Sequence, residues 1–280
     1  MTASSSEGAS RKVVAAITDD AAASIVLSVA DAIANLYSAT VEAVHVGEEQ
    51  ARLTAAAQGA GVPLRTLVGQ PVKALAHAAA AEDVVVVVIG PPGTAAGKRP
   101  AGSTALALVT SLEKPIAVVP PNAPMARPIE SVLVPLDGTA PSTVALQEIA
   151  ALASNAELQI VVAHVNQERS LPAFSDHLSH EVRAWSEEFI ARYCPSATEV
   201  TLELRVGEPH EHVLDILRQS RCDLVALGWS QDFAPGHAAV VRRMLAESPV
   251  PVLLMPVPGD RAFALAAAVP SADTADGERA

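Results

Sequence analysis

The feature that most constrains the fold is an unbroken apolar run at residues 84–89, which reads VVVVVI. A strand consists entirely of aliphatic residues when both of its faces are buried. That situation is typical of a parallel sheet covered by helices on both sides. The run therefore predicts a central strand of an α/β protein.

A glycine-rich loop follows this run and leads into a helix predicted over 105–112. A strand, a glycine loop and a helix N-terminus together present backbone N–H groups to an anion, typically a phosphate. The candidate phosphate-binding residues are Gly90, Gly93, Gly102, Ser103 and Thr104.

The loop is not a P-loop, although it contains a Gly97-Lys98 pair. A P-loop requires a glycine where Pro92 stands, and a Ser or Thr directly after the lysine where Arg99 stands. The hydroxyl that would bind Mg²⁺ is therefore missing.

Apolar runs and helical patterns alternate along the first 120 residues, which predicts a doubly wound parallel sheet. The predicted strands are 12–17, 40–46, 63–68, 84–89 and 115–119, and the predicted helices are 21–36, 51–60, 72–81 and 105–112. A proline-rich linker at 121–128 then ends the pattern.

Beyond the linker the pattern starts again, in the same order. Residues 13–17 correspond to 132–136, and 42–46 to 161–165, with a shift of 119 in both cases. Residues 86–90 correspond to 224–228 with a shift of 138, which predicts an insertion of 19 residues in the second copy. This is an internal duplication. It predicts domain 1 at 12–120 and domain 2 at 129–257, with an inserted helix at about 170–195.

Composition limits the partners and the location of the chain. The net charge of −12 would repel nucleic acid and anionic membranes, so we expect neither as a partner. No apolar stretch is long enough to span a bilayer, and no signal peptide is apparent, so we expect a cytoplasmic protein. We expect residues 1–11 and 258–280 to be disordered. Two cysteines give no disulfide framework.

These features resemble the universal stress protein family. The residues that carry the resemblance are Gly90-x2-Gly93-x8-Gly102-Ser103-Thr104, whose second gap is one residue shorter than usual in the family, and the segments 132–139, 163–165, 205–209, 222–228 and 248–256. The resemblance implies two tandem doubly wound parallel-sheet domains of the adenine nucleotide alpha hydrolase-like type, packed as an intramolecular pseudo-dimer. It also implies a non-enzymatic role in stress response, through binding of ligands or proteins. Further pairing into a homodimer stays open.

The resemblance assigns each copy a different half of an ATP site. Domain 1 keeps the glycine loop and Val44 or Val46 for adenine, but Thr18 stands at the position of the family's aspartate. We expect at most weak ATP binding there. Domain 2 keeps a remnant on the other side of the site, Asp137, Gly138 and Val165. Its glycine-serine pair is replaced by Ala238-Ala239, so we expect it not to bind ATP in the family's manner.

Several alternatives stay open at this stage. The Gly102-Ser103 pair can simply cap a helix, or the loop can serve a slowly ATP-hydrolysing switch. The inserted helix around Trp185 can close a pocket for a small ligand. We predict no catalytic residue and no metal site, because the pairs His177/His180 and His210/His212 have no evident reason to meet.

Overall fold

The computed structural model describes residues 10–18, 22–48, 50–90, 103–124, 127–137, 140–154, 156–166, 199–234 and 238–257. Its strands are β1 (Lys12–Ala16), β2 (Thr40–Val46), β3 (Leu64–Leu67), β4 (Val84–Ile89), β5 (Ile116–Val118), β6 (Ser131–Leu136), β7 (Gln159–Asn166), β8 (Glu199–Val206), β9 (Leu224–Trp229) and β10 (Val252–Pro256). Its helices are α1 (Ala23–Tyr37), α2 (Ala51–Gly59), α3 (Pro71–Ala79), α4 (Ser103–Ser111), α5 (Ala140–Ala153), α7 (Pro209–Ser220) and α8 (Ala239–Glu247).

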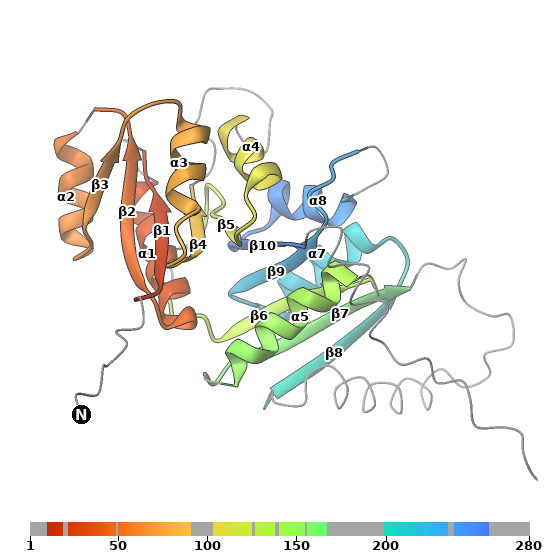
Figure 1. The fold of residues 1–280 in the computed structure, drawn as a ribbon. Helices are drawn as coiled ribbons and strands as arrows, with labels where there is room; N and C mark the ends of the chain where they lie inside the picture. The colour runs from red at the N-terminus through yellow and green to blue at the C-terminus, as the bar shows by residue number, and fades with distance from the viewer. Residues whose placement is uncertain are drawn as a thin grey trace, which may run out of the picture.

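All ten strands belong to one sheet, in the order β3-β2-β1-β4-β5-β10-β9-β6-β7-β8 (Figure 1). Every neighbouring pair is parallel except β5 and β10, which run antiparallel with Ala117 opposite Leu253. The two halves of the order mirror each other about this pair. The predicted α/β class and the doubly wound parallel order within each copy are confirmed.

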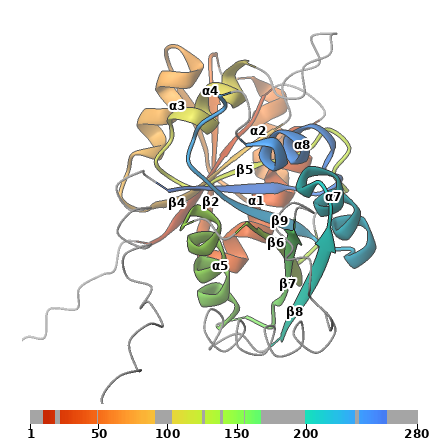
Figure 2. The ribbon, with the colours of Figure 1, turned by 90° about the vertical axis from the view of Figure 1, so that its right-hand side faces the viewer.

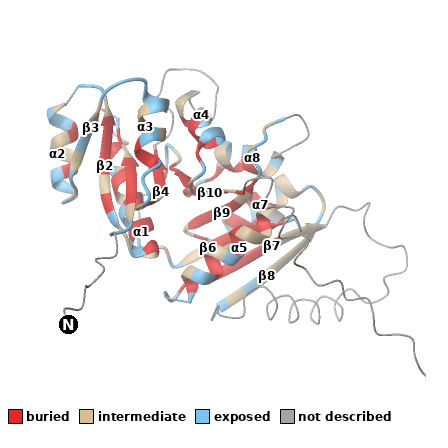
Figure 3. Ribbon diagram, viewed as in Figure 1, coloured by how far each residue is buried: buried red, intermediate tan, exposed pale blue. Residues whose placement is uncertain are grey.

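Helices cover both faces of the sheet (Figure 2). Buried side chains of α1, α2 and α5 pack on one face, and those of α3, α4, α7 and α8 pack on the other. The strands between them are the most buried part of the chain (Figure 3). β4 is buried almost throughout, in agreement with its aliphatic sequence.

The two copies repeat at the level of single residues. Gly69 and Gly207, 138 positions apart, both have left-handed backbone, with φ of 122° and 138°. Each is followed after one residue by a proline at the start of a helix, Pro71 or Pro209. One difference from the sequence prediction concerns α3. We expected a helix from residue 72, but α3 begins at Pro71 because a proline fits the first helical position, where no N–H is needed.

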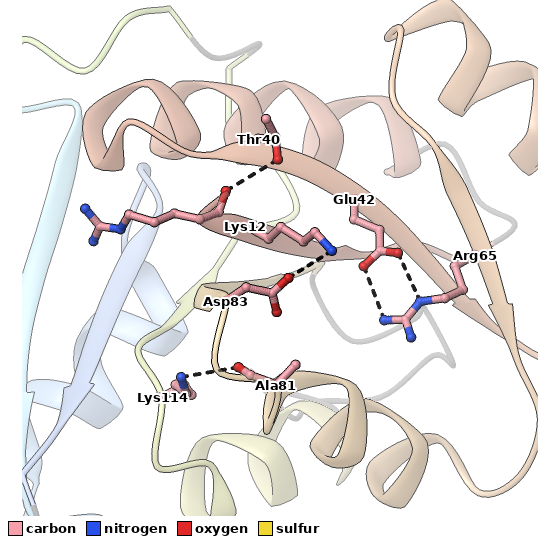
Figure 4. Close-up of polar contacts among 8 residues, drawn as sticks. Lys12, Thr40, Glu42, Arg65, Ala81, Asp83 and Lys114 are labelled. Atoms are coloured by element: carbon pink, nitrogen blue, oxygen red, sulfur yellow. Dashed lines mark hydrogen bonds and ion pairs between the residues drawn. The ribbon is translucent and has the colours of Figure 1, made fainter. Parts of the chain in front are cut away.

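Ion pairs hold the amino-terminal edge of the domain 1 sheet (Figure 4). The Lys12 ammonium lies 2.9 Å from the Asp83 carboxylate, and Arg65 binds Glu42 through two nitrogens. Lys114 donates to the carbonyl oxygens of Ala81 and Val84 at 3.4 and 2.8 Å. In domain 2, Asp223 instead accepts from the backbone N–H and the hydroxyl of Ser131. These contacts lie at the edge opposite the candidate site and join neighbouring strands.

A polar contact between α1 and α5 also links the two copies. The Tyr37 hydroxyl at the end of α1 donates to Glu148 of α5 at 3.1 Å. Burial, together with the Glu148 carboxylate, raises the pKa of Tyr37 well above its ordinary value. Burial likewise raises the pKa of Glu148, against the effects of the Tyr37 hydrogen bond and of Arg11.

Glu148→Gln is therefore expected to alter the pH dependence of stability. The folded-state pKa of Glu148 lies above the unfolded-state value, so this group contributes stability below pH ~4 that is lost as pH rises through the folded-state pKa. The variant keeps an oxygen for Tyr37 but carries no charge. Urea unfolding should show the variant gaining on the wild type between pH 4 and pH 7. A constant difference over that range would contradict the assignment.

Candidate functional site

The topology defines one candidate ligand-binding position in each copy. In open α/β sheets, ligands bind beyond the carboxyl ends of the strands, where neighbouring connections leave toward opposite faces. In domain 1 this switch point lies between β1 and β4, because β1 leads into α1 on one face and β4 leads to α4 on the other. The equivalent position in domain 2 lies between β6 and β9.

The second strand of each copy is tied to the end of the first by a histidine. His45 Nδ1 donates to the carbonyl oxygen of Ile17 at 3.0 Å, and His164 Nδ1 donates to that of Leu136 at 2.8 Å. A carbonyl only accepts, so the ring proton is on Nδ1 in both. The two histidines occupy equivalent positions of the duplication, 119 residues apart. Their contacts give them a structural role beside the switch point.

The predicted adenine-side valines differ in exposure. Val44 is fully buried on β2 in the core beneath α3 and α4. Val46, two residues further along, is half-buried and packs against the same core. Val165 corresponds to Val46 and is also half-buried. Of the two valines considered for domain 1, Val46 therefore presents more surface to a ligand.

The described part of the domain 1 loop consists of its two ends. Gly90 directly follows β4, and a β-carbon there would lie 3.1 Å from the Val26 Cγ2 methyl. α4 begins at Ser103, and Thr104 is half-buried in its first turn. Gly93 and Gly102 lie outside the described residues, as does Gly138 of domain 2. The remaining predicted residues of domain 1 stand at the carboxyl ends of β2 and β4 and at the start of α4.

In domain 2 the predicted aspartate is engaged within the protein. Asp137 follows β6, and its Oδ1 accepts a hydrogen bond of 2.7 Å from the hydroxyl of Ser142, in the first turn of α5. The α5 backbone also approaches the end of β9, where a β-carbon on Gly228 would lie 1.7 Å from the Pro141 carbonyl oxygen. The domain 1 position that corresponds to Ser142 is Ala23, so this pair belongs to domain 2 alone.

Two arginines of α8, which follows the loop after β9, also bind groups of the protein. Arg242 donates to the carbonyl oxygens of Phe233 and Ala234 and stacks over the Phe233 ring, with its guanidinium 5.5 Å from the ring centroid. Arg243 forms an ion pair of 2.9 Å with Glu247. α8 follows Ala238, which has a left-handed backbone and no side-chain cap. Both arginines at this loop therefore have partners in the protein.

The described residues contain no metal cluster and no membrane-spanning helix. Within the described ranges, no three His, Cys, Asp or Glu side chains come together as a metal site. His210 lies 3.9 Å from Glu208, while His177, His180 and Trp185 fall outside those ranges. Burial raises the pKa of the Cys222 thiol to about 11, so it is not activated. No helix in the described part of the chain has the length and apolarity needed to cross a bilayer.

Fold and site together define a tandem α/β protein, with one ligand-binding position at the switch point of each copy. The model of the Universal stress protein family matches residues 47–120 and 128–256, which together are more than half of the chain. The chain therefore belongs to the universal stress protein family, which confirms the resemblance drawn from the sequence.

Solved structures of the same fold span nearly the whole chain. A universal stress protein from Archaeoglobus fulgidus DSM 4304 is 15% identical, with a TM-score of 0.61, over 88% of this chain and 98% of the other. A putative universal stress protein from Pseudomonas aeruginosa UCBPP-PA14 is 17% identical, with a TM-score of 0.64, over 92% and 96%. A functionally unknown protein from Pseudomonas aeruginosa PAO1 is 16% identical, with a TM-score of 0.65. At these identities the likeness concerns the fold. Among curated proteins, none matches the chain.

Proposed function

We propose that this chain is a non-enzymatic binding protein of the universal stress protein type that acts in a stress response. In this proposal, an adenine nucleotide, ATP, binds at most weakly and only in domain 1. Gly90, Gly93, Gly102, Ser103 and Thr104 hold its phosphates, and Val46, with Val44 behind it, lies on the adenine side. Protein partners then distinguish the ATP-bound chain from the free chain.

The observation that carries this proposal is the difference between the two equivalent loops. In domain 2, Arg242 and Asp137 are bound by groups of the protein, and the residues that open α8 are alanines. A β-carbon in place of a glycine obstructs the approach of a phosphate to the backbone. In domain 1 the glycines and the hydroxyl residues at the start of α4 are retained. This supports one site per chain at most.

Weak binding follows from the first strand of domain 1. Thr18 stands at the position that corresponds to Asp137, so the carboxylate on the adenosine side is missing unless a neighbouring residue replaces it. Losing a charged hydrogen-bond partner costs about 1–3 kcal/mol, or roughly a ten- to hundredfold loss of affinity.

Equilibrium dialysis with labelled ATP tests the proposal on the full chain. We expect at most one ATP per wild-type chain, no binding by Gly102→Val, and unchanged binding by the domain 2 control Asp137→Ala. Phosphate release should not exceed that of Gly102→Val. Two ATP molecules per chain, or binding that is lost in Asp137→Ala and kept in Gly102→Val, would contradict the assignment. A wild-type chain that binds no ATP would remove the nucleotide from the proposal.

A further inference from the structure

A side chain of domain 2 holds the end of a domain 1 helix. Gln231, in the loop after β9, donates from Nε2 to the carbonyl oxygens of Val109 and Leu112 at 3.3 and 2.7 Å. Both carbonyls are at the C-terminal end of α4, where helix carbonyls lack intrahelical N–H partners. The amide of Gln231 therefore caps α4 from the other copy.

In the duplication, Gln231 stands where the first copy has a glycine. Gly228 corresponds to Gly90, so Gln231 corresponds to Gly93, the second glycine of the domain 1 loop. Gln231 has a left-handed backbone, a conformation that favours glycine, with φ of 60°. A residue with a β-carbon adopts that conformation only at an energetic cost. At Gln231, the hydrogen bonds across the domain junction offset this cost.

The surroundings make this contact part of a packed junction. Val109 and Leu112 are buried in the same cluster as Trp229, Val241 and Met244 of domain 2. The strands beneath them, β5 and β10, are paired in the sheet. The end of α4 is thus fixed against domain 2 by packing and by the Gln231 amide, while the start of α4 at Ser103 belongs to the proposed phosphate site.

We propose that Gln231 is a positioning residue for the nucleotide site of domain 1, an inference that rests on the proposed function. α4 is a short helix of nine residues, so a shift at its C-terminal end moves its N-terminal N–H groups with it. In domain 2, Gln231 stands in place of a glycine of the phosphate loop. Its side chain instead fixes the position of α4, whose N-terminus belongs to the proposed site of domain 1. The second copy supports the site of the first.

Two variants separate this role from a general effect on stability. Gln231→Glu has nearly the same shape but no donor, and its charge faces the negative end of the α4 dipole. Gln231→Gly also loses the donor but relaxes the left-handed backbone, so it should stay closer to the wild type in stability. The control is Thr110→Ala, because the Thr110 hydroxyl donates to the Leu106 and Ala107 carbonyls of α4 itself.

Equilibrium dialysis with ATP on full-length proteins, with folding checked by circular dichroism, gives the readout. We expect both Gln231 variants to bind ATP about three- to tenfold more weakly than the wild type, and Thr110→Ala to bind equally well. If Gln231→Glu does not fold, Gln231→Gly carries the test. Wild-type affinity in the Gln231 variants overturns this inference alone. Absence of ATP binding in the wild type overturns the nucleotide assignment and this inference with it.

Discussion

Gly228→Ala is expected to lower the free energy of unfolding by about 3 kcal/mol or more. The new β-carbon would lie 1.7 Å from the Pro141 carbonyl oxygen and 3.1 Å from the Ala145 methyl. A backbone oxygen cannot move aside as a flexible side chain can, so the start of α5 or the end of β9 must shift. Urea unfolding followed by circular dichroism measures the loss.

The duplication provides a matched control for this prediction. Gly90 is the equivalent of Gly228, and Val26 is the equivalent of Ala145. A β-carbon at Gly90 would lie 3.1 Å from a methyl group of Val26. That side chain can adjust by a few tenths of an ångström, so Gly90→Ala should cost about 1 kcal/mol or less. Equal losses in the two variants would mean that α5 does not approach β9 as described.

Leu253→Asp is expected to destabilise both copies, by about 4 kcal/mol or more. Leu253 has no exposed surface, and it lies opposite Ala117 in the antiparallel pair that joins the two halves of the sheet. An aspartate there would bury a carboxylate in an apolar core. Because the strands of both copies form one sheet, the damage should reach domain 1 as well as domain 2.

Native-state hydrogen exchange distinguishes this outcome from local damage. The amides of β1 and β2 should lose protection together with those of β6 and β7. Leu106→Asp is the control, because Leu106 lies on α4 with 41% of its surface exposed, and a charge there should change stability by less than about 1 kcal/mol. If Leu253→Asp leaves the protection of β1 and β2 unchanged, the two copies fold independently and the joined sheet does not couple them.

The order of elements could be predicted from the sequence because each central strand is a short aliphatic run followed by turn-forming residues. β4 is the clearest case, since six aliphatic residues end at a glycine. The boundaries that differed were set by local chemistry. The helix predicted from residue 72 starts at Pro71, because a proline fits the first turn.

Long-range contacts could not be predicted in the same way. Tyr37 and Glu148 are 111 residues apart, and neither has a neighbouring motif that indicates the other. The loss of glycine at position 231 could be read from the duplication, but the use of its side chain could not. That use depends on the α4 carbonyls, which only the joined sheet brings within reach. By contrast, the contact of His45 with Ile17 joins two neighbouring strands of one copy. His164 repeats it with Leu136 in the other copy.

Photolabelling tests most directly the central claim that the two copies have divided the roles of nucleotide site and support. The full-length protein is labelled with a photoreactive ATP analogue, digested, and the modified peptides are identified by mass spectrometry. The account predicts a label within residues 12–120 that excess ATP displaces. A displaceable label within residues 129–257 would contradict it.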